Sequence, residues 1–190
     1  VGTAAGASGC ERALPPTAMS RSLPSPSQLS RELRLGSSPD LTRRRQVVGL
    51  SMVGVAAGAV VSLYQTGVIH RLPDPPSGGL FDSERVDASD YAYKRAQTPD
   101  GLAMLVTYGV TALLAGAGGK DRARDLPWLP VALAAKVTSD VVTNWTLARE
   151  EWAENKALCV YCQAANVASM LSLPLVVPEA RRALRRLFGR

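Results

Sequence analysis

Two cysteines, Cys159 and Cys162, form a Cys-Val-Tyr-Cys sequence where the last of four long apolar segments begins. The two-residue spacing brings both sulfur atoms within disulfide reach on one helical turn. At the first turn of a helix, unpaired backbone N–H groups and the helix dipole favour a thiolate and lower the pKa of a cysteine. The pair therefore predicts thiol–disulfide chemistry at the edge of a bilayer, with electrons exchanged with a compound that dissolves in lipid.

Two other interpretations of the cysteine pair remain open. One is half of a zinc site, but the chain has no second CxxC and its only histidine, His70, is isolated. The other is a pair of small, buried cysteines without reactivity. No metal is predicted. The third cysteine, Cys10, lies in the N-terminal arm and is predicted to play no part in the site.

The elements that position the cysteines are long segments with little charge. These segments are 46–69, 101–119, 126–148 and 157–178. Only Lys136 and Asp140 interrupt them. Each reaches or approaches the roughly 20 residues that cross about 30 Å of hydrocarbon. The sequence therefore predicts an all-α, integral membrane four-helix bundle with a long extracytoplasmic loop after its first helix. A soluble bundle of buried, alanine-rich helices is the alternative.

The Lys and Arg residues are distributed unevenly between the two sides of this bundle. Fifteen lie in the N-terminal arm, the second loop and the C-terminal tail, against six in the other two connections. The positive-inside rule therefore places both termini in the cytoplasm. The net charge of +6 follows from this topology. No basic–aromatic pattern indicates binding to nucleic acid.

The composition divides the chain into three regions. Residues 1–42, rich in Ser, Pro, Gly and Ala, predict a disordered cytoplasmic arm. Residues 43–180 are the predicted transmembrane domain, and 181–190 form a basic cytoplasmic tail. The first outer loop, 70–100, is the only connection long enough for structure of its own, and Asp-Ala-Ser-Asp at 87–90 predicts a short helix along the membrane surface.

Other polar and small residues have structural interpretations. Lys136 and Asp140 are four residues apart, so they share a helical face and are interpreted as a pair, with a polar path in the bundle as the alternative. Glu150, Glu151 and Glu154 are interpreted as a solvated face. The glycines predicted to permit close helix packing are Gly54, Gly58 and Gly67.

The chain resembles the vitamin K epoxide reductase family over roughly residues 46–178. Residues 157–163, Ala-Leu-Cys-Val-Tyr-Cys-Gln, match the fourth-helix motif of that family closely. Residues 83–92, followed by Thr-Pro-Asp at 98–100 and Tyr108, are similar to its loop pattern. In that pattern a loop cysteine is followed six residues later by a serine, and then by a helix start and a tyrosine.

The resemblance implies a membrane oxidoreductase that exchanges electrons between a quinone and thiols, in the bacterial inner membrane. Cys162 matches the cysteine nearest the quinone, and Cys159 matches the one that exchanges with other thiols. Ser89 falls on the loop serine that orders the site over the quinone. Asp100 falls where some members have an asparagine that binds a quinone oxygen, and Asn166 where some have a quinone-contacting tyrosine.

The chain departs from the family in the loop. Ser83 stands where the second of two electron-relaying cysteines belongs, and no cysteine lies near Pro75, where the first belongs. The resemblance then implies that an extracytoplasmic thioredoxin-like protein reaches Cys159 directly. The alternative is a non-catalytic membrane helper that retains the fold and uses the loop for docking. We favour the enzyme, because the CxxC pair is retained.

Overall fold

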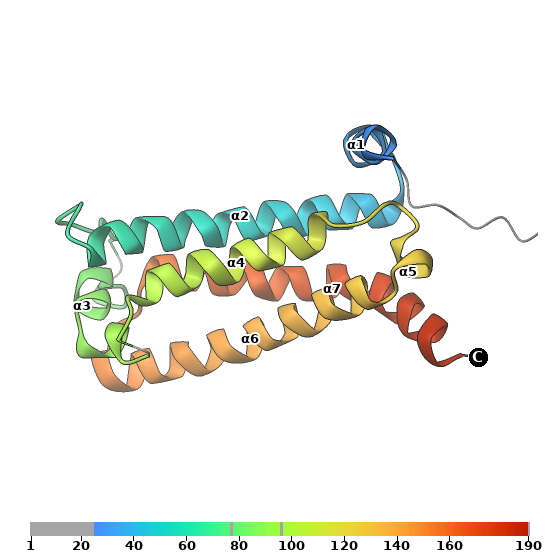
Figure 1. Cartoon of the computed structure of the whole chain (residues 1–190). Coiled ribbons are helices and arrows are strands. Elements are labelled where there is room, and N and C mark those ends of the chain that lie inside the picture. Colours follow the sequence, from blue (N-terminus) through green and yellow to red (C-terminus); the bar gives the residue numbers. More distant parts are fainter. Residues whose placement is uncertain (1–24, 77, 96, 190) are drawn as a thin grey trace, which may run out of the picture.

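The computed structural model describes residues 25–76, 78–95 and 97–189, in which the chain is helical and has no strand. The helices are α1 (Pro26–Leu35), α2 (Pro39–Gln65), α3 (Ser83–Asp87), the 3-10 helix η1 (Asp90–Tyr93), α4 (Asp100–Gly116), α5 (Arg122–Asp125), α6 (Trp128–Asn155) and α7 (Val160–Phe188). The four long helices lie side by side, with α2 against α4 and α7, and α6 against α7 and α4 (Figure 1). The predicted all-α class is confirmed.

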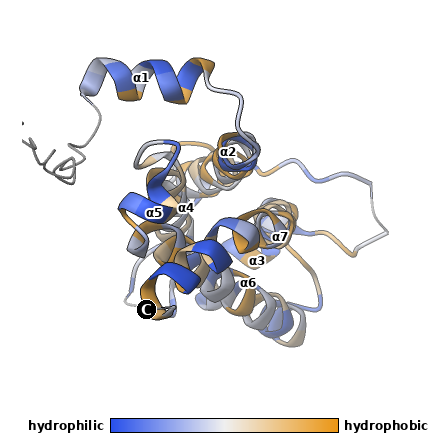
Figure 2. Cartoon of the chain, turned by 90° about the vertical axis from the view of Figure 1, so that its right-hand side faces the viewer, coloured by the Kyte–Doolittle hydropathy of each residue, from blue (hydrophilic) through white to orange (hydrophobic). Residues whose placement is uncertain are grey.

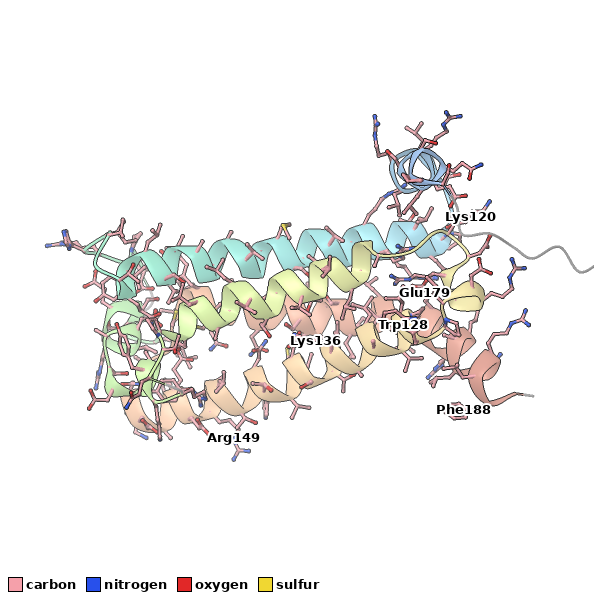
Figure 3. All side chains as sticks on the ribbon, viewed as in Figure 1. Lys120, Trp128, Lys136, Arg149, Glu179 and Phe188 are labelled. Carbon is pink, nitrogen blue, oxygen red and sulfur yellow. The ribbon has the colours of Figure 1, made fainter. Side chains whose placement is uncertain are left out.

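Helices α2 and α7 are long and apolar enough to cross a membrane. Helix α4 is shorter, with 17 residues, and α6 carries Lys136 and Asp140. Lys136 lies in the first half of α6 (Figure 3), and its ammonium group donates to the Asp140 carboxylate. The carboxylate also accepts from the Thr111 hydroxyl of α4 at 3.2 Å. The predicted ion pair is therefore confirmed, and it faces the neighbouring helix.

Glycines bring α2 and α4 close together. A Cβ at Gly54 would lie 2.4 Å from the ring of Tyr108, and one at Gly58 would lie 2.9 Å from the Cβ of Met104. Both positions therefore serve helix packing, as predicted. Gly67 does not, because a Cβ there would meet nothing within 4 Å. Its φ of 77° instead lets the chain turn just after α2.

Residues 26–35, which composition assigned to a disordered arm, form α1 in the structure. Ser25 and Gln28 cap this helix reciprocally, and Pro26 occupies its first position. Local capping of this kind stabilises a helix without a hydrophobic core. Residues 1–24, including Cys10, lie outside the described residues. At the other end, the predicted basic tail continues α7 to Phe188.

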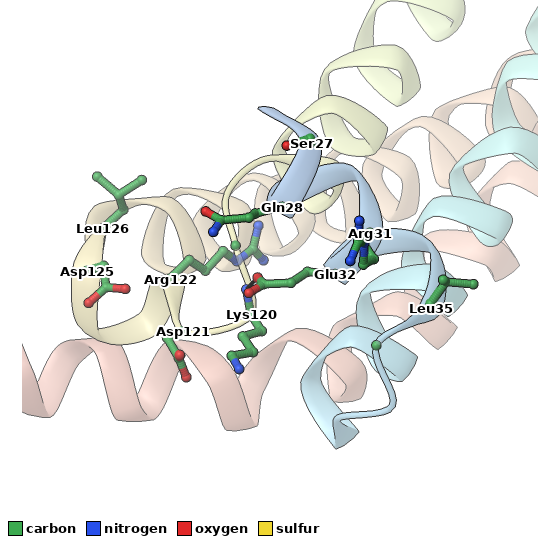
Figure 4. Close-up of a pocket in the computed structure, with 12 residues that line it drawn as sticks. Ser27, Gln28, Arg31, Glu32, Leu35, Lys120, Asp121, Arg122, Asp125 and Leu126 are labelled. Carbon is green, nitrogen blue, oxygen red and sulfur yellow. Dashed lines mark hydrogen bonds between the residues drawn. The ribbon is translucent and has the colours of Figure 1, made fainter. Parts of the chain in front are cut away.

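The end of the bundle that holds α1, α5 and the end of α7 is rich in hydrophilic residues (Figure 2). Arg44 donates to the carbonyl of Ala115 at 2.8 Å and to those of the following residues, which satisfies the open C-terminal end of α4. Arg122 and Glu179 form a buried ion pair at 2.8 Å. An open pocket separates α1 from the segment before α5 (Figure 4).

Candidate functional site

The loop between α2 and α4 folds over the start of α7, at the end of the bundle opposite α1 (Figure 1). Phe81 and Leu158 form a parallel β-bridge, in which Leu158 donates to the carbonyl of Leu80 at 2.9 Å. Asp82 then donates its backbone N–H to Leu158 and caps α3 with its side chain. The bridge thus fixes the loop directly before the cysteines.

Cys159 is the N-cap of α7, as the sequence predicted for a helix start. Its Sγ accepts from the backbone N–H of Cys162 at 3.3 Å. Cys159 is fully buried, Cys162 is half-buried, and both thiols are free. The backbone N–H group of Cys162, at the start of a helix, favours the thiolate form of Cys159. Cys159 is therefore favoured as the nucleophile of the pair.

Ser83 ties the loop to the first turn of α7. Its hydroxyl donates to the Asp74 carboxylate at 2.6 Å and accepts from the backbone N–H of Val160 at 3.0 Å. Its own backbone N–H donates to Asp74 at 2.7 Å. Ser83 is fully buried. The residue at the position of a family relay cysteine therefore makes hydrogen bonds that hold the loop closed over Cys159.

Glu151 is buried at the end of α6, so its assignment to a solvated face is wrong. Its carboxylate accepts from the backbone N–H of Cys159 and, at 3.1 Å, from the Gln163 side chain. The last turn of α6 packs beneath the loop, which removes this side chain from water. Glu150 is half-buried and Glu154 is exposed, in better agreement with the prediction.

Asp87, which the sequence analysis did not select as a site residue, is fully buried at the end of α3. One of its carboxylate oxygens and the sulfur atoms of Cys159 and Cys162 all lie within 4.8 Å of one another. The group contains no histidine, and nothing in it favours zinc over thiol chemistry. Burial, followed by the charge of Cys159, raises the pKa of Asp87 to about 10.

A cavity of about 550 Å³ opens beside the cysteines, between α4, α6 and α7. Its volume falls within the range of small-molecule sites. Cys162 lines this cavity, whereas Cys159 and Asp87 do not. Polar residues in its wall include Asp100, Tyr108, Lys136, Asp140, Asn144 and Glu151. The pair is therefore divided: one sulfur borders the cavity and the other lies behind the loop.

The residues assigned to the quinone by resemblance are only partly brought together. Asp100 lines the cavity from the first turn of α4. Ser89 precedes η1 at its N-cap position, but its hydroxyl donates to the carbonyl of Val86 at 2.6 Å, away from the cavity lining. Asn166 is buried on α7 and donates to the Gln163 side chain at 3.4 Å, also outside the lining.

Asn144, which sequence reasoning did not select as a site residue, joins a polar network in the cavity wall. Its side-chain N–H donates to the hydroxyl of Tyr108 at 2.9 Å and to that of Ser169 at 3.2 Å. The Tyr108 hydroxyl donates in turn to the carbonyl of Ala165 at 2.7 Å. The network fixes polar groups of α4, α6 and α7 at one depth of the bundle. These polar groups are recognised as one network only in the folded structure, because they are far apart in the sequence.

Comparison with known proteins agrees with this geometry. The model of the vitamin K epoxide reductase family matches residues 46–177, which include the loop, the cavity and both cysteines. No curated protein and no solved structure matches the chain. Because the family model covers well over half of the sequence, the chain belongs to the vitamin K epoxide reductase family.

Proposed function

We propose that this protein is a membrane oxidoreductase that exchanges electrons between a quinone and thiols through Cys159 and Cys162. The observation that carries the proposal is the division of the pair between two environments. Cys162 borders the cavity, and Cys159 lies behind the loop as the N-cap of α7. Electrons can then enter from one side and leave on the other through a single disulfide.

The reaction balances without a further reactant. When the reduced pair meets a quinone, the S–H bonds of Cys159 and Cys162 break, the S–S bond forms between them, and two electrons and two protons pass to the quinone, which leaves as a hydroquinone. A dithiol outside the bundle then reduces the disulfide and becomes a disulfide itself. The same steps run in reverse when hydroquinone is in excess.

The outer faces of the four long helices support a position in the bilayer with all four crossing it. Large apolar side chains are exposed on each of them: Met52, Val53 and Leu63 on α2, Val106 and Leu113 on α4, Val142 and Trp145 on α6, and Val167 and Leu171 on α7. An apolar surface on all sides of a bundle would be poorly solvated by water. The basic end that holds α1 and α5 then faces the cytoplasm, and the cysteine end faces outward.

A thiol partner from outside must replace the missing relay. Ser83 and the segment near Pro75 supply no cysteine, and Cys159 is fully buried under the loop. An extracytoplasmic thioredoxin-like protein therefore reaches Cys159 only when the hydrogen bonds of Ser83 and Asp74 open. The same burial is the observation that favours the alternative, a non-catalytic helper that docks partners on a permanently closed loop.

A trapping experiment in native membranes distinguishes the oxidoreductase from the non-catalytic helper. Thiol exchange passes through a mixed disulfide that persists when the resolving thiol is removed. Cys162→Ser should therefore accumulate a covalent adduct through Cys159 that dissociates in reductant. The matched control, Cys159→Ser, should accumulate none. If Cys162→Ser forms no adduct and the wild-type pair alkylates equally in oxidising and reducing conditions, the helper is the better account.

A further inference from the structure

Asp87 is a buried carboxyl group for which protein folding alone gives no reason. It is fully buried, and neither carboxylate oxygen has a hydrogen-bond partner among the described residues. A buried polar group without a hydrogen-bond partner destabilises a folded protein, so such groups are rare. Its nearest chemically reactive neighbours are the sulfur atoms of Cys159 and Cys162, all within 4.8 Å of one another. The side chain therefore lies where a thiol proton is gained and lost.

We propose that Asp87 is the general acid of Cys159, supplying a proton to its Sγ when Cys159 leaves a disulfide. This inference rests on the proposed thiol chemistry and adds a catalytic residue to it. The resemblance to the family assigned no role to this position, and Asp87 lies four residues after Ser83, within the short helix α3. A gap of under 4.8 Å is closed by one bridging water or a small side-chain rotation.

The proposed step balances in the reducing direction. A dithiol first forms a mixed disulfide with Cys159, and Cys162 departs as a thiol. The second sulfur of the dithiol then attacks the first dithiol sulfur, which is bonded to Cys159 in the mixed disulfide. The bond to Cys159 breaks, the electron pair stays on its Sγ, and the Asp87 carboxyl supplies the proton. The second proton released by the dithiol then returns to Asp87, which restores its carboxyl form.

The surroundings keep this carboxyl protonated at neutral pH. The titratable groups that face it are Cys159, Cys162 and Tyr161 near the start of α7, Glu151 on α6, Asp100 on α4, Tyr64 on α2 and Asp74 in the loop. None of them is a cation, so nothing offsets the cost of ionising a buried carboxyl. With a pKa of about 10, Asp87 can donate a proton at neutral pH and cannot above that value.

The test is the rate at which dithiothreitol reduces the Cys159–Cys162 disulfide in the full chain, in detergent, across pH 6–11. Asp87→Asn keeps the volume and removes the proton, and Asp87→Glu keeps the acid. We expect Asp87→Asn to react about 10- to 100-fold more slowly than wild type at pH 7. This factor is at the lower end for general acid catalysis, because a thiolate leaves without protonation more readily than most leaving groups. The ratio should approach one above about pH 10, and Asp87→Glu should recover part of the rate.

Each outcome of these measurements either supports or overturns the role proposed for Asp87. Equal rates for wild type and a folded Asp87→Asn at every pH would overturn the proposal while leaving the redox function intact. A zinc ion that binds the wild type and is lost in Asp87→Asn would also overturn it. If Asp87→Asn fails to fold, infrared difference spectra of the wild type decide instead: reduction should change a protonated carboxyl band, and no change contradicts the proposal. Failure of the wild type to form any disulfide would refute the proposed function itself.

Discussion

Asp100 and Ser89 differ in a way that only their surroundings reveal. Asp100 lies in the cavity wall, where its carboxylate accepts from the Gln65 side chain at 2.6 Å. The Ser89 hydroxyl is committed to a backbone carbonyl of the same loop. A polar group that lines a cavity can bind a ligand, whereas one bound to its own backbone stabilises a turn. The two residues are therefore expected to affect the protein differently.

Replacing Asp100 tests this difference. Asp100 can donate to a quinone carbonyl through its protonated carboxyl, and loss of that hydrogen bond costs about 0.5–1.5 kcal/mol, or about 2- to 13-fold in affinity. Asp100→Ala should therefore raise the dissociation constant of a quinone by that factor, measured by titration of purified protein. Asp100→Asn keeps a donor and should lose less. Ser89→Ala is the matched control and should bind as the wild type does. An equal loss in Ser89→Ala and Asp100→Ala would contradict the assignment.

Among the elements, the contact between α2 and α4 sets the shape of the cavity. Gly54 lies against the flat ring of Tyr108, and the Tyr108 hydroxyl reaches α7. The ring fills the space that a side chain at position 54 would need. Close approach of the two helices therefore places a polar group of α4 in the wall that α7 shares.

Gly54→Ala should disturb this contact. Its Cβ would lie 2.4 Å from the ring of Tyr108, so the ring or α4 must move. Overpacking of this kind costs typically about 1–3 kcal/mol, and the melting temperature in detergent should fall. Gly49→Ala on the same helix is the matched control, because a Cβ there meets nothing within 4 Å. Equal melting temperatures for the two variants would show that the contact is looser than described.

The elements also show what sequence can predict. Long uncharged segments predict helices because a polar backbone in an apolar setting must bond to itself. Their ends are less predictable: α2 begins at Pro39, seven residues before the apolar segment, because Ser38 caps it. The helix start at Cys159 followed from the position of the cysteine pair at the beginning of the last apolar segment. Asp87 and Glu151 were missed because acidic residues normally lie at the surface, and only the folding of the loop over α7 buries them.

At the scale of the whole molecule, the basic residues and the cysteine pair lie at opposite ends of the bundle. The helices α1 and α5 and the end of α7 lie at the basic end, and the loop with α3 lies at the other (Figure 1). In the proposed topology, the positive-inside rule places the first end in the cytoplasm. The same topology would place the cysteines toward the oxidising side of the membrane, where disulfides persist.

The topology is tested by reporter fusions. A reporter fused after residue 190 should be active on the cytoplasmic side, and one inserted near Gly79 in the loop should be active outside. Gly79 is exposed and a Cβ there would meet nothing within 4 Å, so an insertion at this point should disturb little. Reporters that both indicate the same side would exclude four spans.

The most direct test of the central claim is the stoichiometry of electron transfer in purified protein. The fully reduced chain is mixed with a quinone under anaerobic conditions, and hydroquinone is measured together with the Cys159–Cys162 disulfide. Two-electron exchange through the pair predicts one hydroquinone for each disulfide formed, and none in Cys162→Ser or Cys159→Ser. Hydroquinone formation that survives in both variants, or a wild-type pair that stays reduced in excess quinone, would contradict the account.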